Sequence, residues 1–193
     1  MDVIEKTSWY IGLRIFIAIE PDERVRDALA KLPVHFKKSC YKRCVPSENF
    51  HISLFFLGEI GNNTINLVKK CVDKIEGSGY KVIMDSVGCF YRNRIPSIFF
   101  AKGKSEELSI MRENLRNCFV DNNICRNDKS FEAHVTLFRV KKIYDINRFN
   151  DELIDCRKEF KTISFDVKEI GMYSSVLSSS GAIYNKIYNR ALM

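Results

Sequence analysis

Two short segments of the chain carry nearly the same pattern of residues. One reads His51-Ile-Ser-Leu-Phe-Phe and the other His134-Val-Thr-Leu-Phe-Arg, so a histidine precedes a hydroxyl residue by two positions in each. Most of their other residues are apolar and typical of β-strands, in which side chains alternate between two faces. Ser53 is therefore expected on the same strand face as His51, and Thr136 on the same face as His134. Strands placed side by side would line one groove with two imidazoles and two hydroxyls.

The two motifs lie 83 residues apart (134 − 51), and the same offset recurs upstream of them. It aligns two expected strands, residues 13–19 and 96–101, and two expected helix N-caps, Asp22 and Ser105. The strand residues that it pairs are Ile15 with Ile98, Phe16 with Phe99, and Ala18 with Ala101. The apolar helix faces that it pairs are Val25, Ala28, Leu32 and Phe36 with Leu108, Met111, Leu115 and Phe119. The alternative is two unrelated strand–helix–strand units of similar length.

The repeat predicts an α+β fold of two pseudo-symmetric lobes, with the groove between them. Each lobe is expected to be a small, mainly antiparallel sheet with helices on its outer face. We expect a single domain over residues 1–193, with lobe one at about 13–90, lobe two at about 96–190, and strand exchange allowed between them. The remaining expected helices are 63–75, with Leu67, Val68, Cys71 and Ile75 inward, and 146–159, with Ile146, Phe149 and Leu153 inward. The remaining expected strands are 81–90, 162–173 and 182–189, with a bridge between the lobes at 91–95 and a long loop at 39–49.

The charge of the chain favours an anionic partner. Lysine and arginine outnumber aspartate and glutamate by 31 to 24, which gives a net charge of +7. Basic residues cluster at 37–43 and again at 92–104. A solvated surface explains such clusters as well as a nucleic-acid groove does, so charge alone does not identify the partner.

Cysteine usage and hydropathy predict a cytoplasmic or nuclear protein without a membrane segment. The seven cysteines form no CxxC pair, and the N-terminus lacks an apolar leader. We therefore expect all seven to be reduced thiols. No apolar run approaches the roughly 20 residues that cross a bilayer.

Metal and nucleotide-cofactor chemistry is not expected from the motifs present. The chain has three histidines, no HExxH and no cysteine–histidine cluster, so zinc-ligand spacing is missing. It also lacks the GxxxxGK[ST] loop that cradles nucleotide phosphates. The sequence therefore predicts no metal site and no cofactor.

The paired His-x-Ser/Thr-Leu motifs resemble the signature of the 2H phosphoesterase superfamily. More narrowly, the chain is similar to the bacterial and archaeal RNA 2′,3′-cyclic phosphodiesterases, also called 2′-5′ RNA ligases. The similar segments are 14–19, 49–59 and 131–139, and the resemblance extends over about 13–192. Ser53 stands where threonine is usual and keeps the hydroxyl, whereas Ala133 stands where proline is common.

The resemblance implies hydrolysis of 2′,3′-cyclic phosphate ends of RNA to 2′-phosphates without a metal. It implies that His134 deprotonates a water and that His51 protonates the leaving ribose oxygen, although the residues themselves leave the opposite assignment open. Ser53 and Thr136 would bind the phosphate oxygens. Arg139 would contact the phosphate or base, but simple strand alternation points it away from the groove, so a strand end or a twist must turn it inward.

Other functions remain open at this stage. The same chemistry could serve 2′-5′ ligation as the reverse reaction, a 2′,5′-oligoadenylate phosphodiesterase or an exonuclease that trims RNA 3′ ends. A non-catalytic RNA- or nucleotide-binding module is a further alternative, although pure binding does not require a matched proton-transfer pair. The expected partner is RNA with cyclic phosphate ends, or a small cyclic or 2′,5′-linked nucleotide, bound by a monomer.

Overall fold

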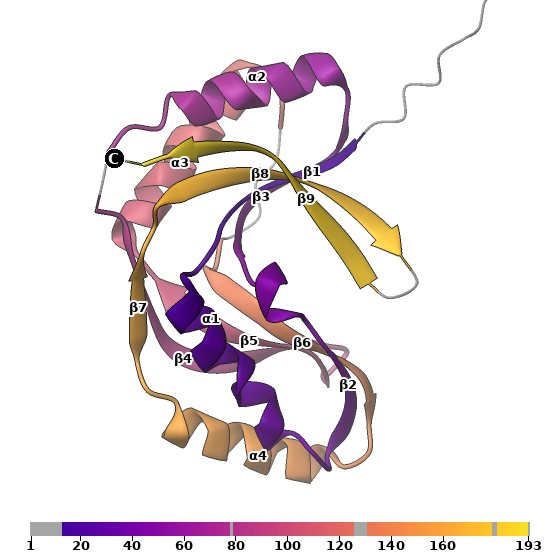
Figure 1. The fold of residues 1–193 in the computed structure, drawn as a ribbon. Coiled ribbons are helices and arrows are strands. Elements are labelled where there is room, and N and C mark those ends of the chain that lie inside the picture. The colour runs from indigo at the N-terminus through magenta and orange to yellow at the C-terminus, as the bar shows by residue number, and fades with distance from the viewer. Residues whose placement is uncertain (1–12, 78, 126–130, 179–180, 193) are drawn as a thin grey trace, which may run out of the picture.

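A computed structural model describes residues 13–77, 79–125, 131–178 and 181–192 (Figure 1). Its strands are β1 Leu13–Ile19, β2 Cys40–Cys44, β3 Ile52–Ile60, β4 Lys81–Arg92, β5 Ile95–Lys104, β6 His134–Ile143, β7 Ile163–Asp166, β8 Glu169–Ser178 and β9 Gly181–Ala191. Its helices are α1 Glu23–Ala30, α2 Asn62–Asp73, α3 Glu106–Asp121 and α4 Ile146–Glu159, with 3₁₀ turns η1 Leu32–His35 and η2 Ser47–Asn49. None of the helices in the described part of the chain has the length and apolarity needed to cross a membrane.

The strands form one curled antiparallel sheet made of two similar halves. The strand order is β7-β4-β5-β6-β3-β1-β8-β9, and β2 pairs with the outer part of β6. The two motif strands, β3 and β6, meet at the centre through the pair Ile52–Val135. Beside β3 lies β1, the first strand of the same repeat, followed by β8 from the other repeat. Beside β6 lies β5, the first strand of the same repeat, followed by β4 from the other repeat. The predicted two-lobed α+β fold is confirmed, with the halves joined into one sheet.

Strands and helices cross between the halves, so neither half is continuous in sequence. Strand β4 lies beside β5, whereas β8 lies beside β1 and β9 follows β8 at the edge of the sheet. Helices α2 and α3 cover the half that contains β1 and β3, and α1 and α4 cover the half that contains β4 and β7 (Figure 1). Each half therefore depends on segments from both ends of the chain.

Both predicted helix N-caps are confirmed. The Asp22 carboxylate accepts a hydrogen bond from the backbone N–H of Val25 at 2.8 Å. The Ser105 hydroxyl accepts one from the backbone N–H of Leu108 at 3.0 Å. Such caps satisfy N–H groups that the first helical turn leaves without a partner, which is why these residues begin helices.

The predicted helix faces are largely correct. All four residues of the α3 face are fully buried. In α1, Val25 and Leu29 are buried and Ala28 is half-buried. The helix ends at Ala30, so Leu32 and Phe36 lie in and just after the 3₁₀ turn η1, which contains Pro33. In α4, Ile146 is exposed, and the buried residues are Phe149, Leu153 and Cys156. In α2, Leu67 is half-buried, and the buried residues are Ile65, Val68, Cys71 and Val72.

Three predicted connections differ from the structure. Residues 91–95 do not bridge the lobes but turn tightly between β4 and β5, with Asn93 and Arg94 at φ values of 51° and 65°. The expected loop 39–49 contains strand β2, which pairs with β6. The expected strand 162–173 breaks after Asp166 into β7 and β8, which pair with opposite ends of the sheet. These differences reflect long-range pairing rather than local propensity.

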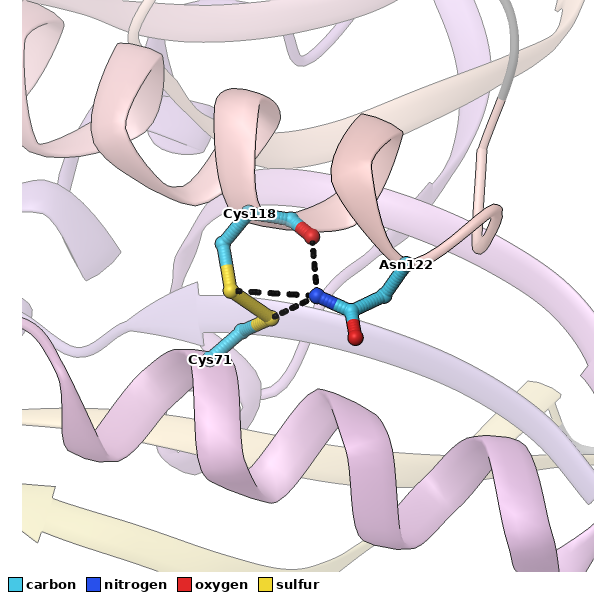
Figure 2. Close-up of a disulfide and its surroundings, with 3 residues drawn as sticks. All are labelled: Cys71, Cys118 and Asn122. Carbon is cyan, nitrogen blue, oxygen red and sulfur yellow. Dashed lines mark hydrogen bonds between the residues drawn. A yellow bond between two sulfur atoms is a disulfide. The ribbon is translucent and has the colours of Figure 1, made fainter.

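The prediction that all cysteines are reduced is wrong for two of them. Cys71 in α2 and Cys118 in α3 form a disulfide with Cα atoms 5.7 Å apart (Figure 2). The side-chain N–H of Asn122 donates to the Cys118 carbonyl at 2.8 Å and lies beside both sulfurs. No local motif marks this pair, because only the packing of α2 on α3 brings the thiols together. Free thiols remain at Cys40, Cys44, Cys89 and Cys156, and burial raises the pKa of Cys156 to about 11.

We predict that the disulfide stabilises the fold by restricting the unfolded chain. The double variant Cys71→Ser/Cys118→Ser should lower the free energy of unfolding by about 3–4 kcal/mol, as estimated for a closed loop of this length. Urea titrations with and without dithiothreitol measure this: the reductant should destabilise the natural protein but not the variant. The exposed Cys44→Ser is the control. Equal midpoints for the oxidised protein and the double variant would contradict the prediction.

Candidate active site

The groove forms where the pairing of β3 with β6 joins the two halves. Ile52 and Val135 face each other across this junction, and both are fully buried in the core. Because side chains alternate along a strand, the residues flanking each of them project from the opposite face of the sheet. Those four side chains line one cavity of about 940 Å³, and they are His51, Ser53, His134 and Thr136.

Each imidazole is anchored in the same way. Nδ1 of His51 lies 2.8 Å from the carbonyl oxygen of Asn49, and Nδ1 of His134 lies 2.7 Å from that of Glu132. A carbonyl oxygen only accepts hydrogen bonds, so Nδ1 carries the proton and donates in both cases. Nε2 of each ring is then the atom that takes up or releases a proton.

Each imidazole also lies against two aromatic rings that restrict its orientation. The ring-centroid distances are 5.1 Å from Phe16 and 5.2 Å from Tyr184 to His51, and 5.1 Å from Phe90 and 5.3 Å from Phe100 to His134. Phe16 and Phe100 are therefore equivalent, at an offset of 84. The predicted alignment of Phe16 with Phe99 is wrong by one residue, because Phe99 lies in the main core on the other face of the sheet.

Arg139 lines the same cavity because β6 contains a β-bulge. Arg139 follows His134 by five positions, so regular alternation would direct the two side chains to opposite faces. The pairing of β6 with β5 skips Leu137, and both Leu137 and Phe138 are buried in the core. The extra residue restores Arg139 to the groove face. All five predicted site residues therefore line one groove.

A second bulge gives the groove an aromatic side chain that the sequence analysis did not select as a site residue. The pairing of β3 with β1 skips Leu54, which is the counterpart of Leu137 at an offset of 83. Phe56 then becomes the counterpart of Arg139, and it lines the cavity with 76% of its surface exposed. The repeat offset of 83 aligns Phe56 with Arg139 in the sequence. It would have predicted a groove position for Phe56 only if both bulges had been recognised. One side of the groove is thus apolar and the other cationic.

The surroundings of His51 shift its protonation. Burial is the largest effect and lowers the pKa of His51, and the positive charge of Arg139 lowers it further. The hydrogen bond to Asn49 and the negative charge of Glu20 act in the opposite direction. Glu20 accepts hydrogen bonds from the Tyr173 hydroxyl at 2.7 Å and from Lys186 at 3.2 Å, beside a small cavity of about 130 Å³ that His51 also lines.

No metal centre is apparent in the described ranges, where no three His, Cys, Asp or Glu side chains gather closely enough to hold an ion. The polar groups at the groove are instead hydroxyls, imidazoles and cations. Hydroxyls and a guanidinium donate hydrogen bonds to phosphate oxygens, and imidazoles transfer protons near neutral pH. The arrangement suits acid–base cleavage of a phosphate ester.

Two histidine–hydroxyl motifs on neighbouring strands of a two-lobed antiparallel sheet are the features of a 2H phosphoesterase. The family model described as the AKAP7 2′5′ RNA ligase-like domain matches residues 16–188. The chain therefore belongs to this family.

Sequence comparison finds similar curated proteins that share the name RNA 2′,3′-cyclic phosphodiesterase. The chain is 26% identical to the RNA 2′,3′-cyclic phosphodiesterase of Archaeoglobus fulgidus, with 91% of this chain and 98% of the relative covered. It is 28% identical to the protein of the same name from Thermotoga maritima, with 91% and 94% covered. The similarity extends over nearly the whole of each relative.

Solved structures support the same fold. TT0787 of Thermus thermophilus superposes with a TM-score of 0.77 at 21% identity, and the match covers 93% of this chain and 98% of that protein. Escherichia coli LigT, solved as a complex with 3′-AMP, has a TM-score of 0.71 at 20% identity, with 94% and 98% covered. At this level of sequence identity, the similarity to these structures shows a shared fold and nothing more.

We predict that NMR of the imidazole nitrogens will detect the Nδ1–H tautomer for both His51 and His134 when they are neutral. The same titration should give His51 a pKa below the ordinary value for histidine, because burial disfavours its charged form. Glu20→Gln should lower this pKa further, since it removes a nearby negative charge while keeping a hydrogen-bond acceptor. Glu23→Gln, at the exposed start of α1, is the matched control. A His51 pKa that rises in Glu20→Gln would contradict this account.

Proposed function

We propose that this protein hydrolyses the 2′,3′-cyclic phosphate ends of RNA to 2′-phosphates, using its two histidines and no metal. The observation that carries the proposal is the convergence of two identically anchored imidazoles, each with its hydroxyl neighbour, in one groove. The names of the Archaeoglobus and Thermotoga relatives support the same reaction.

The reaction needs one proton removed and one delivered. His134, through Nε2, takes a proton from the water that attacks phosphorus. The bond between phosphorus and the ribose 3′-oxygen breaks, and His51 gives its Nε2 proton to that leaving oxygen. The 2′-phosphate remains on the ribose, and a proton exchange with solvent restores both rings. Acid and base catalysis of this kind contributes about 10²–10⁴ each in rate.

The remaining groove residues bind the charged phosphate. The Ser53 and Thr136 hydroxyls donate to its non-bridging oxygens, one from each half of the sheet. Arg139 supplies a positive charge from the side of the groove opposite Phe56. These donors act where negative charge concentrates as water adds to phosphorus, so they stabilise the transition state more than the ground state.

Substrate binding prepares His51 for its role as acid. In the free protein its lowered pKa favours the neutral ring. A phosphodiester anion bound between the imidazoles attracts the charged form and raises this pKa. The acid thus becomes protonated when substrate is present.

The apolar side of the groove suits a nucleobase. Phe56, Ile183 and Tyr184 line it, and Phe56 and Ile183 are exposed. Stacking of a base on an aromatic side chain contributes about 1–3 kcal/mol. We further propose that the protein is a monomer with a single domain, in the cytoplasm or nucleus. An RNA 5′-hydroxyl that attacks phosphorus in place of water, with the 3′-oxygen again leaving, would give a 2′-5′ linkage by the same groups, and this ligation is reversible.

We predict that His51→Gln and His134→Gln will each lower kcat for a 2′,3′-cyclic nucleotide by about 10²–10⁴. The double variant should be little worse than either single variant, because the two rings serve one concerted reaction. Chromatography of the product distinguishes a 2′-phosphate from a 3′-phosphate, and a 2′,5′-linked dimer tests the alternative substrate. His35→Gln, which alters the histidine outside the groove, is the control. Near-normal turnover in either groove variant would end the acid–base scheme.

We also predict a bell-shaped dependence of kcat/KM on pH that EDTA does not change. Two groups must act in opposite protonation states, so activity falls on both sides of an optimum. Because the pKa of free His51 is lowered, the alkaline limb of kcat/KM should begin below the ordinary histidine pKa, and Glu20→Gln should move it to still lower pH. The alkaline limb of kcat should lie at higher pH, since bound phosphate favours the protonated ring. Activity that EDTA abolishes and a divalent ion restores would exclude the proposed mechanism.

A further inference from the structure

Two arginines face each other at the cationic side of the groove. Arg43 in β2 lies directly opposite Arg139 in β6, and both side chains are exposed and line the cavity. Residues paired in this way have Cβ atoms about 4.5–5.5 Å apart, and like charges at such positions destabilise the pair. An anion bound between them would remove that repulsion.

A third cation, Lys141, extends this arrangement along β6 and lines the same cavity. It lies two residues beyond Arg139, which is about 7 Å along a strand. Within the described ranges, none of Arg43, Arg139 and Lys141 forms an ion pair. We call these three residues the cationic row.

Three other basic residues of the 37–43 and 92–104 sequence clusters are neutralised or turned away from the groove. Lys102 pairs with Glu132 at 2.6 Å, and Lys104 pairs with Asp85 at 2.5 Å. Lys42 lies on the other face of β2, where it donates to the Phe36 carbonyl and lies over the Phe138 ring. Of the basic residues in those two clusters, Arg43 is the one that lines the groove, and β6 supplies Arg139 and Lys141.

We propose that Arg43 and Lys141 bind backbone phosphates on the 5′ side of the terminal nucleotide and so determine a preference for an RNA strand over a mononucleotide. This inference rests on the proposed function. With the cyclic phosphate at the histidines and its base toward Phe56, the chain leaves toward the cationic row. The cavity of about 940 Å³ lies at the upper end of the usual range of about 300–1,000 Å³ for small-ligand sites. Cations spaced about 7 Å apart along a strand can each contact a different phosphate of an RNA backbone, whereas a single phosphate could not contact the whole cationic row.

The test compares three substrates that carry the same 2′,3′-cyclic nucleotide. They are the mononucleotide, the mononucleotide with a 5′-phosphate, and a trinucleotide that ends in the cyclic phosphate. We expect kcat/KM to be highest for the trinucleotide. Arg43→Gln and Lys141→Gln should each lower the ratio of trinucleotide to mononucleotide kcat/KM by about fivefold to tenfold. Lys70→Gln removes one exposed positive charge from α2, outside the groove, and should leave that ratio unchanged.

Binding of the product trinucleotide with a 2′-phosphate gives an independent measurement. The slope of log K against log salt concentration should become shallower by about 0.7 for each lost phosphate contact. Equal kcat/KM for mononucleotide and trinucleotide, or unchanged salt slopes in both groove variants, would overturn the inference. A 5′-phosphorylated mononucleotide as good as the trinucleotide would assign the site to a terminal phosphate and also overturn it. Failure to turn over any substrate would refute the proposed function instead, and the salt slopes would still decide whether the cationic row binds RNA.

Discussion

The geometry of the groove depends on a single backbone pairing between two halves of the sheet. Ile52 and Val135 meet at this junction and are buried on the core side, so their neighbours must project to the opposite side. A slip of one residue in either strand would exchange the two faces of that strand and bury its histidine. The apolar core therefore fixes the register, and the register places the polar site. This is why two motifs 83 residues apart in the sequence form one site.

Local features of the sequence predicted much of this fold. The motifs, the two N-caps and the α3 face rest on residues within one or two turns of each other, where periodicity and capping chemistry are informative. The bulges at Leu54 and Leu137 could not be read in this way, because a bulge exists only relative to a partner strand. The same holds for strand β2 and for the Cys71–Cys118 disulfide, which depend on contacts between distant segments.

The two halves share a frame but differ in the chemistry that they present. Each anchors its imidazole through Nδ1 on a carbonyl two residues earlier and clamps it between aromatic rings. The residues after each bulge differ, since Phe56 occupies in one half the position that Arg139 occupies in the other. Glu20 is a further difference, because its carboxylate lies beside the small cavity that His51 lines and favours the charged form of that ring. The two halves are thus similar in backbone structure, but the groove between them has one apolar side and one cationic side.

Both bulges reconcile the needs of the core with those of the groove. Each lets two consecutive apolar residues enter the core, Leu54 with Phe55 and Leu137 with Phe138. Without the extra residue, one apolar side chain of each pair would face the groove, and Arg139 would point into the core, where an unpaired charge is costly to bury. The large buried side chains therefore do more than stabilise the fold. Their packing maintains the bulges that place Phe56 and Arg139 in the groove. The packing of Leu137 and Phe138 on the apolar face of the sheet therefore determines that the Arg139 charge lies on the groove face.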